Sequence, residues 1–476
     1  MNYINFENTK QHIHFIGIGG ISMSGLAQIL FQKGFHISGS DMKSSPTTTH
    51  LQKLGIPIHI GHRASNISPT TDLIVYTAAI KEDNEERMAA IKNNIPTIDR
   101  AQLLGEIMKN YDYPIAVAGT HGKTTTTSML THIFLHAKKD PTITVGGMLD
   151  AINGNLHIGR SSYFITEACE YCDSFLKFYP FIALILNIEA DHLDYFKDIK
   201  QIRQSFKNFA KKVPTEGSLI INSDIENIEE MIEGLSCNVI TFGFCPEKSL
   251  WYPANITYDS KALGTFDIFY NEQQMGRIHL QVPGEHNIYN ALSACATGYE
   301  LGLPMETIIE GLSQYRGTHK RFEYKGNLKG VTIIDDYAHH PTEIKATLKV
   351  AKQYPHKTLW CVFQPHTYTR TKAFLTEFAS ALEKADKVIL TDIYAAREKN
   401  TGEIHALDLL NELQKNGKEV YYFPTFEEIE CFLLENCIPG DLLITMGAGD
   451  VSIIGEELLG RELSTLSTEL STISKA

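Results

Sequence analysis

Apolar and polar residues along the chain alternate in the way that is typical of proteins built on parallel sheets. Residues His12–Ile18 alternate and run into a glycine turn, after which Met23–Phe31 carry apolar residues at helical spacing. Similar β-rich apolar runs, separated by helical or loop segments, follow at Leu73–Tyr76, Ile115–Ala118, Tyr163–Thr166, Ile182–Leu186 and Leu219–Ile221. This pattern predicts strands joined by helices, and therefore parallel sheets.

The pattern changes twice in the second half of the chain. Between residues 239 and 282, aromatic and β-branched residues form short alternating pieces with a turn signal at Asn271-Glu272, which predicts a small antiparallel addition. Helical spacing resumes at Asn287–Leu301, and the charged segment Gly317–Arg321 is typical of a linker. Strands and helices then alternate again, with strands expected at 331–335, 358–363, 387–390 and 441–446.

The length of the chain predicts more than one domain. At 476 residues it is too long for a single ordinary core, and a prior of ~150 residues per domain suggests about three. Asp112-Tyr113-Pro114 marks one plausible boundary. We expect an α/β fold with three domains, residues 1–107, 108–316 and 317–476. The Ser- and Thr-rich tail, Ser464–Ala476, is expected to be frayed or weakly helical.

Composition narrows the classes of function. The formal charge of −13 argues against a general nucleic-acid binder and favours small-molecule partners. No run of ~18 apolar residues could insert into a membrane, and the N-terminus lacks the features of a signal peptide, so we expect a cytoplasmic protein. The eight cysteines are scattered, and the close pair Cys169 and Cys172 has no second pair that would complete a zinc site. We therefore interpret that pair as structural.

The strongest local signal is the segment AGTHGKTT, residues 118–125, which lies between a predicted strand and a predicted helix. Its glycines let backbone N–H groups converge on phosphate oxygens, and the helix N-terminus adds positive potential. Lys123 would neutralise charge, and the Thr124 hydroxyl can bind Mg²⁺. The segment is shorter than the usual phosphate-binding pattern because Val117 stands where a glycine is expected. The alternative is a chance glycine-lysine turn.

A second glycine turn lies near the start of the chain. Gly17, Gly19 and Gly20 resemble the dinucleotide fingerprint GxGxxG, but Ser22 replaces its last glycine. Asp41, 24 residues beyond Gly17, is close to the position of a ribose-binding acid. The turn predicts a nucleotide site, and a tight strand-helix turn without a ligand is the alternative.

Polar side chains, most of them carboxylates and imidazoles, follow several predicted strands, where open sheets bind ligands. They are Glu167 and Glu170 after one strand, and Asn187, Asp191, His192 and Asp194 after the next. Because a phosphate-bound Mg²⁺ prefers one or two carboxylates beside the loop hydroxyl, Glu167 is a candidate ligand. His192 is either a further ligand or a structural hydrogen-bonding residue.

The last α/β unit carries two polar segments at strand ends. His339 and His340 are adjacent, so they cannot easily share one zinc ion, and orientation of a substrate or nucleotide is the favoured interpretation. His366 and Arg370 follow the next strand. The guanidinium group of Arg370 has the geometry to bind a carboxylate or a phosphate. The alternative interpretation is that Arg370 is a solvated arginine in a loop.

Together these segments resemble the Mur ligases, and the resemblance runs in order from about His12 to Gly449. Its most specific pieces are HFIGIGGISMSG, AGTHGKTTT, EACEY, NIEADHLDYF, GEHNIYNALSA, DDYAHHPTE and FQPHTYTRT. The resemblance implies a Rossmann-like N-terminal domain for a UDP group, a central P-loop ATPase domain, and a Rossmann-like C-terminal domain for an amino acid. The implied reaction is ATP-dependent joining of L-alanine to the carboxylate of UDP-N-acetylmuramate through an acyl phosphate, in peptidoglycan precursor synthesis.

The resemblance also implies roles for individual residues. ATP would be bound by Gly119, Thr120, His121, Gly122, Lys123, Thr124, Thr125, His286, Asn287, Asn290, Arg321 and Asp336, and Mg²⁺ by Thr124, Glu167 and His192. The UDP substrate would be bound by Gly17, Gly19, Gly20, Ser22, Asp41 and His366, and the catalytic residues would be Lys123, His192, His339 and Arg370. Two positions depart from the family pattern: Ser22 replaces the usual Gly, and Thr367 replaces an Arg of many members.

Three alternatives remain at the level of sequence. A nicotinamide-dependent oxidoreductase would use the first glycine turn but leaves AGTHGKTT unexplained. A P-loop switch or regulatory ATPase explains Lys123 but not the polar strand ends of the third unit. A ligase that recycles a murein tripeptide onto the same nucleotide differs only in its amine. For the ligase we expect a monomer or homodimer, with hinge closure near Gly317–Lys320.

Overall fold

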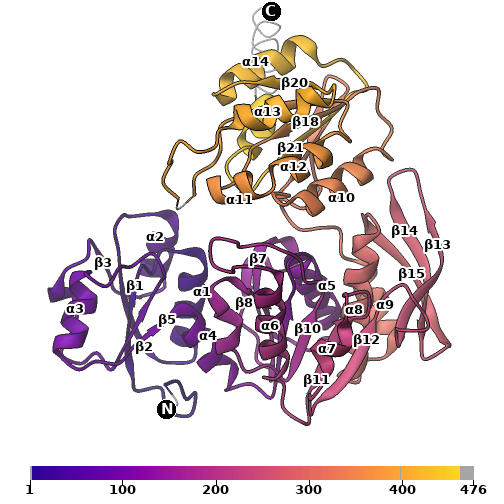
Figure 1. Cartoon of the computed structure of the whole chain (residues 1–476). Coiled ribbons are helices and arrows are strands. Elements are labelled where there is room, and N and C mark those ends of the chain that lie inside the picture. Colours follow the sequence, from indigo (N-terminus) through magenta and orange to yellow (C-terminus); the bar gives the residue numbers. More distant parts are fainter. Residues whose placement is uncertain (1–2, 397, 461–476) are drawn as a thin grey trace, which may run out of the picture.

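The chain folds into three α/β units, each built on its own sheet (Figure 1). The computed structural model describes residues 3–396 and 398–460, so the predicted weakly helical tail at Ser464–Ala476 lies outside the described residues. The predicted fold class, three-domain α/β, is confirmed. Each sheet lies within one of the ranges 1–107, 108–316 and 317–476, whose exact boundaries stay a prediction.

The first sheet contains five parallel strands in the order β3-β2-β1-β4-β5. Its elements are β1 (His12–Ile16), α1 (Ile21–Gln32), β2 (His36–Asp41), α2 (Pro46–Lys53), β3 (Ile58–Ile60), η1 (Ala64–Asn66), β4 (Leu73–Tyr76), α3 (Glu85–Lys92), β5 (Thr97–Asp99) and α4 (Arg100–Met108). Helix α2 begins where the Ser45 side chain accepts the Thr48 N–H and Pro46 occupies the first helical position. The glycine turn after β1 lies at the carboxyl edge of the sheet, where ligands bind in such folds.

The central sheet contains ten strands in the order β15-β14-β13-β12-β11-β10-β6-β9-β7-β8. Its elements are β6 (Tyr113–Ala118), α5 (Lys123–His136), β7 (Thr142–Leu149), η2 (Asp150–Ile152), β8 (Gly154–His157), β9 (Tyr163–Ala168), η3 (Tyr171–Lys177), β10 (Ile182–Ile185), α6 (Ile199–Ala210), β11 (Ser218–Asn222), α7 (Ile228–Ile232), β12 (Asn238–Phe242), β13 (Trp251–Tyr258), β14 (Leu263–Tyr270), β15 (Gln273–Pro283), α8 (His286–Glu300) and α9 (Met305–Ser313). Strand β10 is buried along its whole length, as expected of a parallel strand covered on both faces.

The antiparallel addition is present, but its predicted start at residue 239 is wrong. Strands β13, β14 and β15 pair antiparallel, whereas β12 pairs parallel with β11. The addition therefore begins at Trp251 and continues the central sheet. The sequence of a short strand such as β12 does not show whether its neighbour runs parallel or antiparallel. The pattern of apolar residues therefore could not show that β12 belongs to the parallel part of the sheet.

The third sheet has the order β16-β17-β21-β18-β19-β20 and is parallel except for its edge strand β16. Its elements are β16 (Glu323–Leu328), β17 (Val331–Asp336), α10 (Pro341–Ala351), β18 (Leu359–Phe363), α11 (Tyr368–Ala373), α12 (Leu375–Leu382), β19 (Lys387–Leu390), α13 (Ala406–Lys415), β20 (Glu419–Tyr422), α14 (Phe426–Asn436) and β21 (Leu442–Met446). The predicted linker Gly317–Arg321 contains no helix or strand and leads into this unit.

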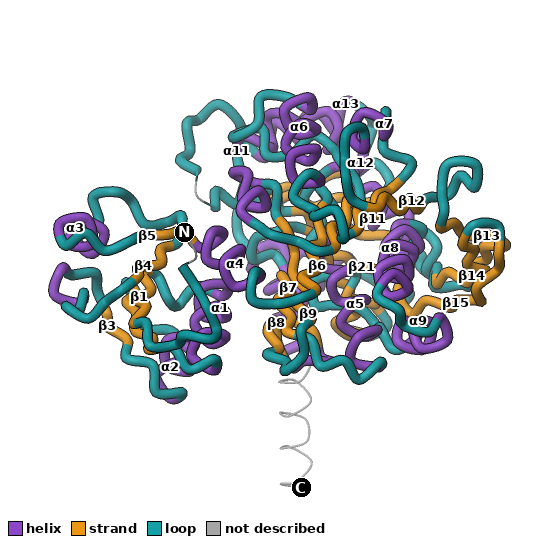
Figure 2. The backbone as a smooth tube through the Cα atoms, turned by 90° about the horizontal axis from the view of Figure 1, so that it is seen from below, coloured by secondary structure: helices purple, strands orange, loops and turns teal. Residues whose placement is uncertain are grey.

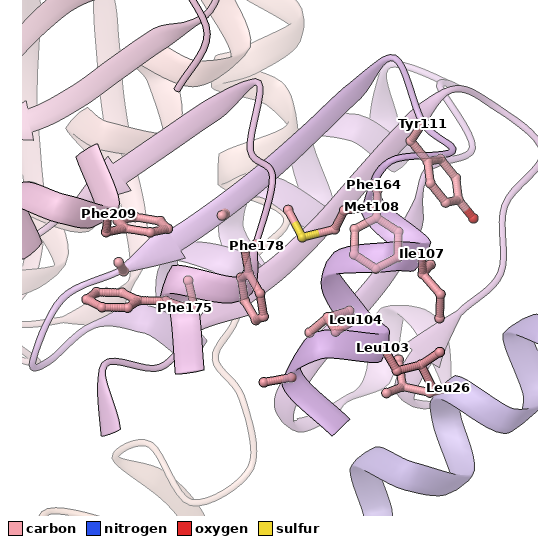
Figure 3. Close-up of a cluster of buried hydrophobic side chains, with 14 of the residues drawn as sticks. Leu26, Leu103, Leu104, Ile107, Met108, Tyr111, Phe164, Phe175, Phe178 and Phe209 are labelled. Carbon is pink, nitrogen blue, oxygen red and sulfur yellow. The ribbon is translucent and has the colours of Figure 1, made fainter. Parts of the chain in front are cut away.

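The first and central units share one apolar core. Leu26 of α1 and Leu104 of α4 belong to the same buried cluster as Phe164 of β9 and Phe178 after η3 (Figure 3). Seen from below, α1 and α4 lie between the two sheets (Figure 2). Removing this apolar surface from water holds the two units together, at roughly 25 cal/mol for each Å² buried.

The third unit is joined to the rest in a different way. Among the described residues, its buried apolar clusters contain only its own side chains, and hydrogen bonds of His340, Thr342 and Arg370 cross to the central unit. An interface without a shared apolar core resembles one that opens and closes. In residues 3–396 and 398–460, no helix is both long and apolar enough to cross a bilayer.

Candidate active site

The loop between β6 and α5 has the shape that phosphate binding requires. Gly119 and Gly122 adopt φ of +145° and +85°, which L side chains rarely adopt. A Cβ on Gly122 would lie 2.6 Å from Asn290 Oδ1, so only glycine fits there. No side chain caps α5, whose first N–H groups have no partner within the helix and can bind an anion.

Asn187, which follows β10, fixes this loop in place. Its Oδ1 accepts the His121 N–H at 2.8 Å, and its Nδ2 donates to the His121 carbonyl at 3.1 Å. Strand β10 lies next to β6 in the sheet, so the carboxyl ends of both strands meet at the same edge. The loop is therefore organised before any ligand arrives.

Lys123 is paired inside the protein. Its Nζ lies 3.1 Å from Glu170 Oε2 and also donates to the Thr120 carbonyl at 3.1 Å. Burial alone would lower the pKa of Lys123, but the charge of Glu170 outweighs it and raises the pKa above its usual value. The lysine is therefore charged at neutral pH, and Glu170 is the counter-ion that a bound triphosphate would replace.

The three predicted metal ligands Thr124, Glu167 and His192 lie around one cavity of about 310 Å³ that Lys123 also lines. Glu167 accepts the Gly146 N–H, which fixes its carboxylate beside the loop. Burial lowers the pKa of His192, so its imidazole is neutral at pH 7 and carries a lone pair. A hydroxyl, a carboxylate and a neutral imidazole are chemically suited to a divalent ion, and the oxygens suit Mg²⁺.

Arg370 of α11 reaches across to the central unit. Its Nε and Nη2 donate to Asp191 Oδ1 at 3.1 and 3.0 Å, and its Nη1 lies 3.1 Å from His366 Nδ1. Burial would raise the pKa of Asp191, but the charge of Arg370 outweighs it and holds the pKa well below its usual range. The pair is nearly buried, with 9% and 8% of the two side chains exposed. It closes one side of the cavity.

His339 follows β17 and lines the same cavity. Its Nδ1 donates to the Tyr337 carbonyl at 2.9 Å, which leaves the lone pair on Nε2. Burial lowers the pKa of His339 to about 4, so the imidazole stays neutral at pH 7. A neutral imidazole in this position can accept a hydrogen bond through Nε2.

His121 links the loop to helix α10. Its Nδ1 lies 3.0 Å from Glu343 Oε1, and its Nε2 lies 3.6 Å from Glu189 Oε2. Burial would lower the pKa of His121, but the charges of Glu343 and Glu189 outweigh it and raise the pKa to about 9. The protonated imidazole therefore holds the central and C-terminal units together at neutral pH.

This pKa predicts how stability depends on pH. Because the folded-state pKa lies above the ordinary value of 6.5, the stabilisation is complete below pH 6.5 and is lost as the pH rises through 9. We expect the free energy of unfolding to fall by up to about 3 kcal/mol across this window. Urea unfolding at pH 6 and pH 9.5 measures the fall, and His121→Asn should abolish most of it. An equal fall in parent and variant would contradict this role.

The predicted nucleotide residues of the second half lie around a neighbouring cavity of about 280 Å³. Its lining includes His121, Gly122, Thr125, His286, Asn287, Asn290, Arg321 and Asp336. Asn287 and Asn290 are buried and bonded internally, since Asn290 Nδ2 donates to Asn287 Oδ1 at 3.0 Å. Asp336 accepts the Phe322 N–H at 2.9 Å, and burial raises its pKa to about 6. These residues form the walls of the cavity.

The first glycine turn lies apart from these two cavities. Asp41 Oδ2 accepts the Gly19 N–H at 2.8 Å, so this carboxylate holds the turn itself. Ser22 Oγ accepts from Arg100 at 3.1 Å, and both residues line a third cavity of about 370 Å³. Gly17, Gly19, Gly20 and Asp41 do not line any of the three cavities formed by the described residues. Their contact with a UDP group stays a prediction.

The three cavities form a series. His121, Gly122, Arg321 and Glu343 line both the first and the second cavity, and Glu167 and Cys169 line both the second and the third. The structure thus places many of the residues predicted to bind ATP, the residues predicted to bind the metal, and Ser22 around neighbouring cavities. Arg100, Glu189 and Glu343 line these cavities but were not among the predicted site residues. Glu170, the partner of Lys123, was noted in the sequence only as a carboxylate that follows a strand. Glu343 carries a local signal, because Pro341 and Glu343 occupy the first and third positions of a capped helix.

Comparisons with known proteins agree with this arrangement. Three family models match consecutive parts of the chain: "Mur ligase family, catalytic domain" at residues 12–112, "Mur ligase middle domain" at 117–298 and "Mur ligase, glutamate ligase domain" at 320–449. Together they span most of the chain. The protein belongs to the Mur ligase family.

Individual relatives and solved structures within this family are similar to the chain over most of its length. UDP-N-acetylmuramate–L-alanine ligase of Agathobacter rectalis is 57% identical over 94% of this chain and 97% of its own length, and that of Lachnoclostridium phytofermentans is 56% identical over 96% and 100%. Among solved structures, UDP-N-acetylmuramate-alanine ligase of Thermotoga maritima matches with a TM-score of 0.78 and 30% identity, covering 95% of this chain and 99% of that one. A murein peptide ligase of Psychrobacter arcticus matches with a TM-score of 0.69 and 26% identity, covering 94% and 98%.

Proposed function

We propose that the protein joins L-alanine to the carboxylate of UDP-N-acetylmuramate at the expense of ATP, giving ADP and phosphate. The reaction passes through an acyl phosphate and supplies peptidoglycan precursors in the cytoplasm. The proposal is supported by relatives that are 51–57% identical and carry the name of this activity. The murein peptide ligase in the comparison is more distant, at 26% identity.

The observation that carries the proposal is the series of three neighbouring cavities, in which each cavity shares lining residues with the next. ATP fits the first two, with its base between the central and C-terminal units and its phosphates at the loop that ends in Lys123. The third cavity lies between the first and central units, where Ser22 and Arg100 can receive a UDP-linked sugar. Glu167 borders both the second and third cavities, so the muramoyl carboxylate and the terminal phosphate meet beside it.

The side chains in the second cavity suit the two chemical steps. In the first step the substrate carboxylate attacks the γ-phosphorus and ADP leaves, and Lys123 and the N–H groups of α5 hold the transferring group. In the second step the amine attacks the acyl carbon and phosphate leaves. His339 Nε2 carries a lone pair that can accept a hydrogen bond from the attacking amine and orient it. Arg370 offsets negative charge in the same cavity.

Magnesium completes the site in this proposal. The ion would be held by Thr124, Glu167 and His192, and it supplies charge neutralisation for the phosphates. We expect Glu167→Gln to raise the Mg²⁺ concentration for half-maximal activity by about tenfold. The variant should still fold. A titration of activity against Mg²⁺ measures this shift, with the exposed Glu233→Gln as the control. An unchanged titration would remove Glu167 from the metal site.

Phosphate release tests the proposed function as a whole. The protein with ATP and Mg²⁺ should release phosphate only when both UDP-N-acetylmuramate and an amine are present, and L-alanine should be used in preference to a murein tripeptide. Release without an acceptor would indicate a P-loop switch or regulatory ATPase. Preference for the tripeptide would identify the recycling ligase instead.

A further inference from the structure

Three metal-binding side chains meet where the central unit touches the C-terminal unit. His121 belongs to the phosphate loop, Glu189 follows β10, and His340 precedes α10. One ring nitrogen of each histidine and one carboxylate oxygen of Glu189 lie within 4.8 Å of one another. Two imidazoles and a carboxylate form the ligand set that Zn²⁺ and similar ions prefer.

His121 is arranged as a metal ligand. Its Nδ1 is hydrogen-bonded to Glu343 Oε1 at 3.0 Å, so Nε2 is the ring nitrogen that would lose its proton to an entering metal ion. Nε2 is buried, has no hydrogen-bond partner among the described residues, and lies 3.6 Å from Glu189 Oε2. Metal-bound histidines commonly donate their other N–H to a carboxylate in this way. The charge of Glu189 beside Nε2 helps to keep this ring protonated, and an entering metal ion would take the place of that proton.

The other two side chains are oriented by further hydrogen bonds. His340 Nε2 lies 3.0 Å from the Ala190 carbonyl, which leaves the lone pair on Nδ1, where the contact with the Thr342 N–H is 3.4 Å long. Thr342 Oγ1 donates to Glu189 Oε2 at 2.6 Å and fixes that carboxylate. Each of the three side chains therefore has a partner that sets its direction, as in built metal sites.

The charge around the triad also favours a dication. Glu189 and Glu343 face it from the central unit and from α10, and Arg321 is the cation that faces Glu343, with Nη1 4.0 Å from Oε1. Two carboxylates balance the guanidinium and the protonated ring of His121, so the neighbourhood becomes negative once His121 gives up its proton to an entering ion. An entering divalent ion would offset that charge.

We propose that His121, Glu189 and His340 bind a divalent transition-metal ion of the Zn²⁺ type, which joins the central and C-terminal units. Three protein ligands leave the fourth position open to water or a small ligand. The site is separate from the predicted Mg²⁺ residues Thr124, Glu167 and His192. It lies beside His121, where the first two cavities meet, but binding of the ion does not depend on the proposed function.

Zinc binding to the full chain tests the proposal without nucleotide or substrate. Metal-free protein carrying Glu167→Gln and His192→Asn, which disable the predicted Mg²⁺ ligands, is titrated with Zn²⁺ against a chromophoric chelator. One saturable site is expected. Adding Glu189→Gln or His340→Asn should weaken Zn²⁺ binding by about tenfold or more. His136→Asn, whose ring pairs with Glu310 at 2.9 Å elsewhere, should leave it unchanged.

Two results would overturn the proposal. One is a Zn²⁺ affinity that stays the same when Glu189→Gln or His340→Asn is added to the protein carrying Glu167→Gln and His192→Asn. If the protein with His340→Asn fails to fold, the result for Glu189→Gln decides. The other is a zinc anomalous-scattering peak, in crystals of the unsubstituted protein soaked with Zn²⁺ alone, that lies away from the triad. A peak between His121, Glu189 and His340 would support it.

Discussion

Lys123→Ala is expected to lower kcat by about 100-fold or more, because the ammonium group stabilises the transferring phosphoryl group and no other side chain can take its place. The substitution also leaves Glu170 buried without its ion-pair partner. An unpaired buried charge destabilises the fold. We therefore expect a lower free energy of unfolding in Lys123→Ala and partial recovery of that stability, without recovery of kcat, in Lys123→Ala/Glu170→Gln.

Steady-state phosphate release and urea unfolding separate these two effects. Lys211→Ala, which removes an exposed lysine at the end of α6, is the matched control and should retain the parent kcat. If Lys123→Ala keeps kcat within about threefold of the parent, the lysine does not act on the phosphoryl group.

Arg370→Ala is expected to lower kcat/KM by about 100-fold. The Arg370–Asp191 pair crosses between units that share no apolar cluster among the described residues, and breaking a buried pair costs about 3–5 kcal/mol. Because the two units share no apolar cluster among the described residues, the cost should appear as a looser contact between them while each unit stays folded. Kinetics together with the radius of gyration from small-angle X-ray scattering measure both consequences.

The control for this experiment is an arginine in a surface pair. Arg203 of α6 lies 3.8 Å from Glu230, whose side chain is 71% exposed, so Arg203→Ala should change neither kcat/KM nor the radius of gyration. Parent-like kcat/KM in Arg370→Ala would show that this pair does not organise the site. Global unfolding of Arg370→Ala would show that the pair contributes to the stability of the whole fold. The contact between the central and C-terminal units would then be tested with Asp191→Asn.

Much of the fold follows from local patterns. Strand β4 coincides with the predicted Leu73–Tyr76, and α8, His286–Glu300, lies one residue before the predicted Asn287–Leu301. Both elements have periodic apolar residues that pack on one core, so their spacing alone indicates them. The phosphate loop was predictable for a similar reason, since its glycines, Lys123 and Thr124 are contiguous in sequence.

The rest of the site depends on contacts that local patterns do not contain. His121 and Glu343 are 222 residues apart, and Arg370 and Asp191 are 179 apart, so only the docking of two units brings them together. The pairing of Lys123 with Glu170 was missed because the fold places the end of β9 beside the loop after β6. Parallel strands can be expected to meet at one edge, but their order in the sheet is not written in any single strand.

A crystal structure of the protein with ATP, or a non-hydrolysable analogue, and Mg²⁺ tests the central claim most directly. The account predicts a triphosphate held by the N–H groups of residues 119–125, with Lys123 Nζ turned from Glu170 to within ~3 Å of a phosphate oxygen. A nucleotide bound elsewhere, with the pairing of Lys123 and Glu170 intact, would contradict it.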